Sequence, residues 1–245
     1  MRPLLLSLPA LLLLPILLPA QAMTTVSTKW NDSFVEWEVY ALMPVDTTAD
    51  QAREKSKKKK TGKKKGGLTK PKNDPEPDQA PTPPPPDSLR SDEGQAEPPP
   101  MPLQEQRFGE FRLRWLDVRD DWSEWDFELG DQRGTIRAKW KDDPTQWELR
   151  TYSGAIVSMR AMWPNDNTQW RITDNSISLN FKSRWTNQLD EWLTDDTVHG
   201  RFYLYTLRQQ DPRDWAIEDA MEPTVSTPMK LAMVFLAVFQ STPKM

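Results

Sequence analysis

The chain has 245 residues, no cysteine, a single histidine and a formal charge of −4 at neutral pH. The lack of cysteine excludes disulfides, thiolate metal sites and a lipid-modified N-terminal cysteine, so an exported domain of this sequence must be stabilised by its core. The sequence contains no phosphate-binding glycine loop, dinucleotide fingerprint, zinc-protease motif or nucleophile elbow, and it therefore predicts no catalytic residue and no cofactor.

Residues 1–22 have the three parts of a secretory signal peptide. Arg2 precedes a leucine-rich apolar run, and Ala20-Gln21-Ala22 forms a small-x-small end, which predicts cleavage before Met23. An uncleaved membrane anchor is the alternative, because the apolar run approaches the roughly 20 residues that cross a bilayer. Either way we expect an exported protein that is periplasmic, secreted or held at the cell surface.

Residues 23–43 are predicted to form a first β-hairpin, and residues 44–106 a disordered insertion after it. Within the insertion, residues 53–72 carry eleven basic residues against one acidic residue, whereas residues 73–106 are acidic and rich in proline. Such a composition cannot bury a core.

The basic part of the insertion predicts contact with an anionic membrane surface or an acidic polymer. Such contact depends on charge, so no specific nucleic acid is expected, and a merely solubilising loop is the alternative. The predicted contact residues are Lys57, Lys58, Lys59, Lys60, Lys63, Lys64 and Lys65.

A short tryptophan-ending core recurs six times along the chain. It ends at Trp37, Trp125, Trp147, Trp170, Trp192 and Trp215, and the last five are 22 or 23 residues apart. A second large apolar residue precedes each core, namely Trp30, Trp115, Trp140, Trp163, Trp185 and Leu207. Trp122 is the only tryptophan outside these two positions, so it is the indole that we expect to be exposed and to contact a partner.

Apolar and polar residues alternate on both sides of each core, which is the pattern of a half-buried strand. Ile136, Ala138 and Trp140 share one face before the turn, and Trp147 and Leu149 share one face after it. The alternation predicts that both tryptophans of a pair point inward, around an acidic turn. Residues 23–43 and 107–225 then give six hairpins, or twelve antiparallel strands, with opposite charges paired on the outer face.

Residues 226–245 are predicted to form a helix and a short tail. The segment 228–239 is apolar apart from Lys230, and about twelve residues are too few to span a bilayer. A helix that is apolar on every side belongs in a core, although a tail anchor is the alternative. Twelve strands closed into a barrel enclose more space than ordinary side chains fill, so large indoles and this helix are expected to occupy the interior.

Six antiparallel hairpins followed by one apolar helix resemble the tubby-like barrel, which is shared by tubby C-terminal domains, phospholipid scramblases and LURP-one-related proteins. The D-x-x-x-W-x-I rhythm of residues 166–172 and 211–217 adds to the resemblance, which covers residues 24–43 and 107–240. It implies a closed barrel threaded by its helix. It carries over no ligand site, because the phosphoinositide-binding basic residues of tubby domains match no position here. The cysteine-rich and calcium-site segments of scramblases are absent.

The sequence therefore predicts an exported, non-enzymatic barrel that acts as a binding or envelope-associated accessory module. A carbohydrate-binding module that uses exposed tryptophans and a hydrolase with paired carboxylates are the alternatives. His199 is interpreted as a loop residue. The acidic turns at 142–143, 165–167 and 195–196 lack the order of a calcium loop, so no metal is expected.

Overall fold

The computed structural model describes residues 22–44, 102–118, 121–141 and 143–243. The strands are β1 (Met23–Trp30), β2 (Ser33–Pro44), β3 (Leu103–Leu113), β4 (Glu124–Leu129), β5 (Gln132–Trp140), β6 (Asp143–Thr151), β7 (Ile156–Trp163), β8 (Asp166–Thr173), β9 (Ser178–Trp185), β10 (Gln188–Asp196), β11 (Gly200–Arg208) and β12 (Asp211–Met221). One helix, α2 (Thr227–Ser241), follows them.

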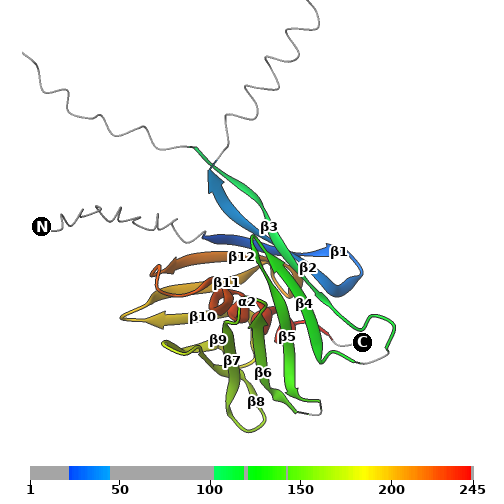
Figure 1. Cartoon of the computed structure of the whole chain (residues 1–245). Coiled ribbons are helices and arrows are strands. Elements are labelled where there is room, and N and C mark those ends of the chain that lie inside the picture. The colour runs from blue at the N-terminus through cyan, green and yellow to red at the C-terminus, as the bar shows by residue number, and fades with distance from the viewer. Residues whose placement is uncertain (1–21, 45–101, 119–120, 142, 244–245) are drawn as a thin grey trace, which may run out of the picture. The chain divides into compact units, whose positions relative to one another are not determined.

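The twelve strands form a closed antiparallel barrel in sequence order, and β1 pairs with β12 to close it (Figure 1). The predicted fold class is thus confirmed. Strand β3 begins at Leu103, so residues 103–106 belong to the barrel and not to the insertion in which they were expected. Arg107 Nε lies 3.0 Å from Glu38 Oε1 on β2, which ties β3 to the strand before the insertion. The predicted signal peptide and most of the insertion lie outside the described residues.

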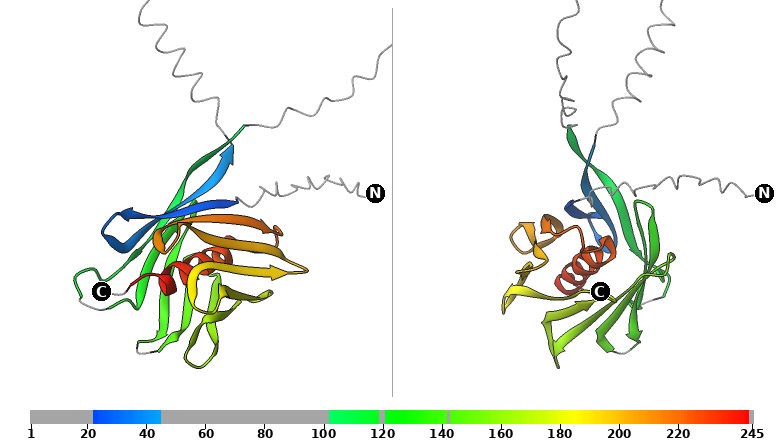
Figure 2. Two further views of the ribbon diagram at one scale, coloured as in Figure 1. Left: turned by 180° about the vertical axis from the view of Figure 1, so that it is seen from behind. Right: turned by 60° about the vertical axis from the view of Figure 1, so that its left-hand side comes forward.

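Helix α2 lies inside the barrel, surrounded by the strands (Figure 2). Every side chain from Pro228 to Phe239 is buried, as the uniformly apolar sequence predicts. The ring of Phe235 lies 5.1 Å from that of Trp147 and 5.6 Å from that of Trp125, and Phe239 lies 4.7 Å from Trp147. These edge-on contacts between large rings fill the space that twelve strands enclose.

The one charged residue of the helix is paired inside the barrel. Lys230 Nζ lies 2.9 and 2.7 Å from the two carboxylate oxygens of Asp219 on β12, and the side chains are 3% and 1% exposed. A buried charge is tolerated only when it is paired and hydrogen-bonded. The pair therefore fixes the position of the first turn of α2 against the last strand.

The predicted inward direction of both tryptophans in each hairpin is wrong for the first of each pair. In the β7–β8 hairpin Ala161 pairs with Trp170, but the next pair is Trp163 with Asp166, so β8 has two more residues than β7 in this interval. The same shift occurs between Ala138 and Trp140 in the β5–β6 hairpin. A bulge bends and twists its strand, so the hairpin tip leaves the regular ladder and carries the first indole out of the core.

The second tryptophan of each hairpin is held inward by a repeated hydrogen bond. In all six hairpins its indole N–H donates to the carbonyl oxygen three residues earlier, at 2.8–3.1 Å. A buried indole needs such an acceptor. The bulge supplies the acceptor, because its backbone carbonyl is turned away from the strand ladder. These indoles are 0–3% exposed.

A capping side chain at the start of the bulge completes the motif in five of the hairpins. Asp143 Oδ1 accepts a hydrogen bond from the backbone N–H of Thr145 at 2.9 Å and another from its hydroxyl group. Equivalent caps on the backbone N–H come from Ser33, Asp121, Asp166 and Asp211. The recurring D-x-x-x-W sequence is therefore the signature of an Asx-capped bulge.

Replacement of Lys230 by methionine should lower the free energy of unfolding by about 3–5 kcal/mol, because Asp219 is then left buried without its partner. Urea denaturation followed by circular dichroism measures the change. The double variant Lys230→Met/Asp219→Leu should recover much of the loss. Equal unfolding midpoints for the single variant and the wild type would contradict this account of the pair.

The Asx caps should make the fold sensitive to acid. Hydrogen bonds from Ser123 lower the pKa of Asp121, those from Thr145 lower the pKa of Asp143, and those from Arg213 lower the pKa of Asp211. A carboxylate whose folded pKa is lowered stabilises the fold above its unfolded pKa of about 3.9, and this stabilisation is lost as the pH falls through the folded value.

The thermal midpoint should therefore vary little between pH 7 and pH 5 and fall below about pH 4. Asp143→Asn keeps an oxygen acceptor but removes the charge, so its midpoint should fall less steeply with acid than that of the wild type. Differential scanning calorimetry at a series of pH values checks both statements. Parallel pH curves for the two proteins would show that this carboxylate does not contribute.

Candidate functional site

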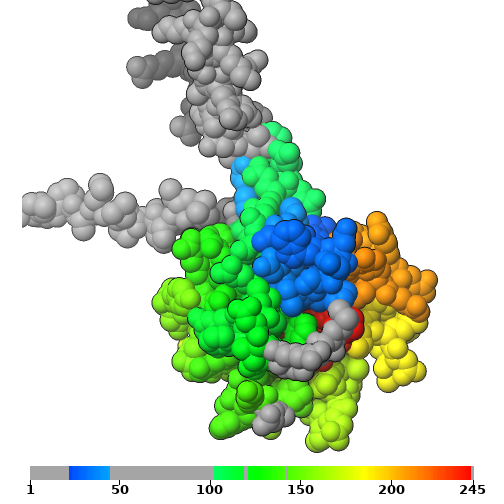
Figure 3. All heavy atoms as spheres, turned by 90° about the vertical axis from the view of Figure 1, so that its right-hand side faces the viewer, coloured from blue at the N-terminus to red at the C-terminus, as the bar shows by residue number. Residues whose placement is uncertain are grey.

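Five tryptophans at the hairpin tips are exposed at one end of the barrel. In an up-and-down barrel all turns that join an odd-numbered strand to the next strand lie at the same end. The C-terminal end of α2 lies there too, because Ser241 Oγ donates a hydrogen bond to the carbonyl oxygen of Leu189 beside the β9–β10 turn. Figure 3 shows this end, with the β1–β2 hairpin in blue and red C-terminal residues visible among the hairpins.

We call this set of side chains the indole rim, namely Trp30, Trp115, Trp140, Trp163 and Trp185, with Leu207 at the sixth tip. Trp140 and Trp163 are the most exposed, at 61% and 57%, and the other three indoles are 45–53% exposed. The alternation in the sequence did not predict this exposure. In the hairpins of Trp140 and Trp163 the Asp-x-Thr step at 143–145 and 166–168 was the available signal, because it favours a capped turn over a regular strand.

Trp122, the indole expected to be exposed, is half-buried. Its ring lies 6.1 Å from that of Trp125, and its carbonyl oxygen accepts the indole hydrogen bond of Trp125 at 3.1 Å. Its carbonyl group thus accepts the indole hydrogen bond that recurs in all six hairpins. Its contact with a partner stays a prediction. The indoles of the indole rim are more exposed than Trp122.

Three of the exposed indoles are fixed against the outer wall by charged neighbours. Trp30 Nε1 donates to Glu36 Oε2 at 2.9 Å, and Lys29 lies 5.7 Å from the ring centroid. Trp115 has the same arrangement with Glu124 and Arg114. The ring of Trp185 lies 5.0 Å from the guanidinium carbon of Arg184. A cation over an indole face stabilises the wall, and it leaves less of that face open to a ligand.

Trp140 and Trp163 differ from the other three. The residue that precedes the inner tryptophan is a glutamine in their hairpins, Gln146 and Gln169, where the three hairpins above have glutamate. Within the described part of the chain, neither indole N–H has a hydrogen-bond partner and neither ring lies under a cation. These two indoles are therefore the ones whose faces and N–H groups are open to a ligand.

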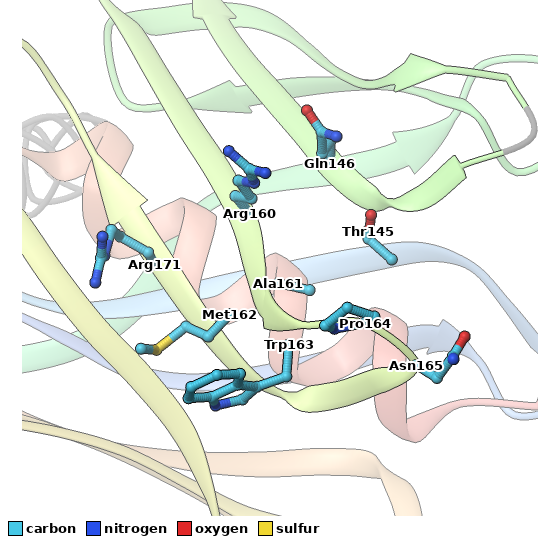
Figure 4. A pocket seen from close by; sticks show the side chains of 9 residues that line it. All are labelled: Thr145, Gln146, Arg160, Ala161, Met162, Trp163, Pro164, Asn165 and Arg171. Atoms are coloured by element: carbon cyan, nitrogen blue, oxygen red, sulfur yellow. The ribbon is translucent and has the colours of Figure 1, made fainter.

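A surface pocket of about 420 Å³ lies beside Trp163. Its polar lining comes from Thr145 and Gln146 on β6, Arg160 on β7 and Arg171 on β8, and Figure 4 shows these side chains on three neighbouring strands. The rest of the lining is Ala161, Met162, Pro164 and Asn165 at the β7–β8 tip. The pocket thus combines an aromatic ring, amide and hydroxyl groups, and two guanidinium groups.

The two arginines of this pocket face each other directly, since Arg160 and Arg171 are partners in the β7–β8 ladder. Like charges in directly opposed positions of a sheet are destabilising. Within the described residues, neither guanidinium has a carboxylate oxygen within 4 Å. The hydrogen bonds from Thr145 make the largest contribution to lowering the pKa of Asp143, and the charge of Arg160 makes a smaller one. The arrangement places two cations side by side on the wall, without an ion-pair partner among the described residues.

Three glutamates of the wall have lowered pKa values. A hydrogen bond from the Trp30 indole lowers the pKa of Glu36, one from Arg150 lowers that of Glu148, and one from the Tyr203 hydroxyl lowers that of Glu191. A glycosidase general acid needs a raised pKa. These three carboxylates therefore suit charge pairing and not proton donation near neutral pH.

The remaining sequence predictions concern His199, metals and the lysines. His199 Nδ1 lies 2.9 Å from Asp196 Oδ1, which also accepts the backbone N–H groups of Val198 and His199, so this histidine belongs to a capped turn. No group of three metal-ligating side chains occurs among the described residues. The predicted lysine contacts, 57–60 and 63–65, lie outside the described residues.

None of the helices in the described ranges is long and apolar enough to cross a membrane.

Fluorescence quenching should separate the indole rim from the core. Acrylamide should quench a red-emitting fraction and leave a blue-emitting fraction protected, because five indoles are exposed and six are buried. Trp163→Phe should reduce the quenchable fraction, whereas the matched core change Trp170→Phe should reduce the protected one. Uniform protection of all emission in the wild type would contradict the exposed rim.

Searches of protein-family models, curated proteins and solved structures gave no match to this chain.

Proposed function

We propose that the protein is a non-catalytic binding module and that it binds a carbohydrate chain at the indole rim. The observation that carries the proposal is the division of the tryptophans: six are buried, while five at one end of the barrel are 45–61% exposed. Clustered exposed aromatic rings mark an interaction surface. An indole offers a flat apolar face to a sugar ring and an N–H to its hydroxyl groups.

The polar hairpin tips favour a glycan over a membrane as the ligand. Exposed Asp32, Lys141, Asn165, Asn187 and Gln210 occupy the turns beyond the indoles. Insertion of the rim into a bilayer would bury these groups without hydrogen-bond partners, at a cost of several kcal/mol for each group. A glycan can use them, since its hydroxyl groups both donate and accept hydrogen bonds.

Three further considerations support a binding module over an enzyme. The wall glutamates Glu36, Glu148 and Glu191 have lowered pKa values, which disfavours the paired-carboxylate hydrolase. The sequence contains no nucleophile elbow, zinc-protease motif or phosphate-binding glycine loop. The signal-peptide pattern of residues 1–22 agrees with exposure to extracellular or envelope polysaccharides. The lysine block at 53–72 would add a separate, charge-dependent contact.

The double variant Trp140→Ala/Trp163→Ala should weaken retention on an immobilised polysaccharide by at least about tenfold, which corresponds to about 1.4 kcal/mol. Its thermal midpoint should stay near that of the wild type, because both side chains are exposed. Affinity electrophoresis of the full chain against a panel of neutral and acidic polysaccharides measures the effect.

Two controls accompany this experiment. Trp30→Ala removes an indole that is already fixed by Glu36 and Lys29, so it should change retention less. A variant with the lysines at 57–60 and 63–65 replaced by glutamine separates loop charge from the rim. Retention of the wild type on anionic vesicles and on no polysaccharide would show that the glycan assignment is wrong.

A further inference from the structure

The arginine pair beside Trp163 differs from other arginines of the outer wall that lie opposite carboxylates. In the β5–β6 hairpin the equivalent ladder position pairs Arg137 with Glu148, and Arg137 Nη2 lies 3.4 Å from Glu148 Oε1. In the β3–β4 hairpin the equivalent position pairs Arg112 with Asp126. Arg160 and Arg171 instead face each other across the β7–β8 ladder. Their partners on the two flanking strands are neutral: Gln146 on β6 lies opposite Arg160, and Asn180 on β9 lies opposite Arg171.

The charges of this pair do not favour folding. Two cations in directly opposed positions repel each other, and both side chains are exposed, so they do not fill core space. Two other hairpins have a carboxylate at the position of Arg171, namely Glu148 opposite Arg137 and Asp126 opposite Arg112. A cationic pair kept beside an open indole therefore suggests an anionic ligand that takes the place of the missing carboxylate.

We propose that Arg160 and Arg171 form the anion-binding part of the Trp163 pocket and that the pocket selects a sugar bearing a carboxylate or a sulfate ester. The inference rests on the proposed carbohydrate-binding function and names its substrate class. The guanidinium groups bind the anion through charge-assisted, bidentate hydrogen bonds. Trp163 holds the apolar face of the same or the next sugar ring.

The rest of the pocket favours a sugar over a simple anion. Thr145, Gln146 and Asn165 line it with neutral hydrogen-bonding groups, which suit hydroxyl groups and add little to the binding of a bare phosphate or sulfate. Its volume of about 420 Å³ lies within the usual range for small-molecule sites. Met162 and Trp163 give the lining an apolar side that a free anion would leave unused.

The test compares two polymers that differ only in charge, polygalacturonate and its fully methyl-esterified form. Wild-type protein should bind the acid form at least about tenfold more tightly at about 0.1 M salt. Arg160→Gln/Arg171→Gln should bring the ratio of the two affinities close to one. Trp163→Ala should weaken binding of both polymers by similar factors and leave the ratio unchanged.

The matched control is Arg137→Gln, an arginine on the same wall that is paired with Glu148; it should leave the ratio as in the wild type. Thermal midpoints give an independent readout, because the arginine double variant should be as stable as the wild type or more stable. A lower midpoint would indicate a structural role for the pair and overturn the inference.

The remaining outcomes separate the two proposals. If the wild type binds both polymers and the arginine double variant keeps the wild-type ratio, the inference fails while the carbohydrate-binding function stands. If the wild type binds neither these nor any other polysaccharide, both fail. Inorganic sulfate and short polyphosphate are added as competitors; competition as strong as that of oligogalacturonate would show a charge-only site and overturn the sugar assignment.

All binding measurements are repeated with the lysines at 57–60 and 63–65 replaced by glutamine. The preference for the acid polymer should persist in that background, because the arginine pair lies on the barrel wall. Loss of the preference there would assign it to the insertion and contradict the inference.

Discussion

The interior of a twelve-stranded barrel must be filled, and most other features of this protein depend on how that is done. About eight strands already enclose a volume that ordinary side chains occupy. Here helix α2 and six inward indoles fill the remaining volume. Two of these indoles, Trp125 and Trp147, contact the phenylalanine rings of the helix. Each inner indole must also satisfy its N–H in the absence of water, and the capped bulge of its own hairpin provides the acceptor.

The same bulge determines the exposed surface. Because the outgoing strand gains two residues at the tip of the β5–β6 and β7–β8 hairpins, Trp140 and Trp163 are turned away from the barrel interior. One local device thus produces both the buried ring of tryptophans and the indole rim. Differences between hairpins then come from single neighbours: a glutamate and a cation cover Trp30 and Trp115, whereas glutamine leaves Trp140 and Trp163 open.

The architecture was predictable from the sequence because it depends on period and spacing. Alternation around Ile136 and Leu149, the 22- or 23-residue repeat and the apolar segment 228–239 each have one simple structural solution. The direction of Trp163 was not predictable by alternation, since a two-residue shift in register lies between it and Trp170. The arginine pair was not predictable either, because that prediction requires knowing which residue lies opposite Arg160 on the neighbouring strand. Only the ladder shows that this partner is another arginine.

The central position of α2 constrains the order in which the parts of the protein can fold. The helix is the last element of the chain, yet it is the centre of the core, and Lys230 and Asp219 join it to the last strand. Hairpins near the N-terminus can form locally as they emerge, but none can bury its apolar face until residues 227–241 exist. Assembly of the core therefore waits until α2 has been synthesised. A chain that stops before residue 227 would therefore leave the apolar faces of all its hairpins without the helix that covers them.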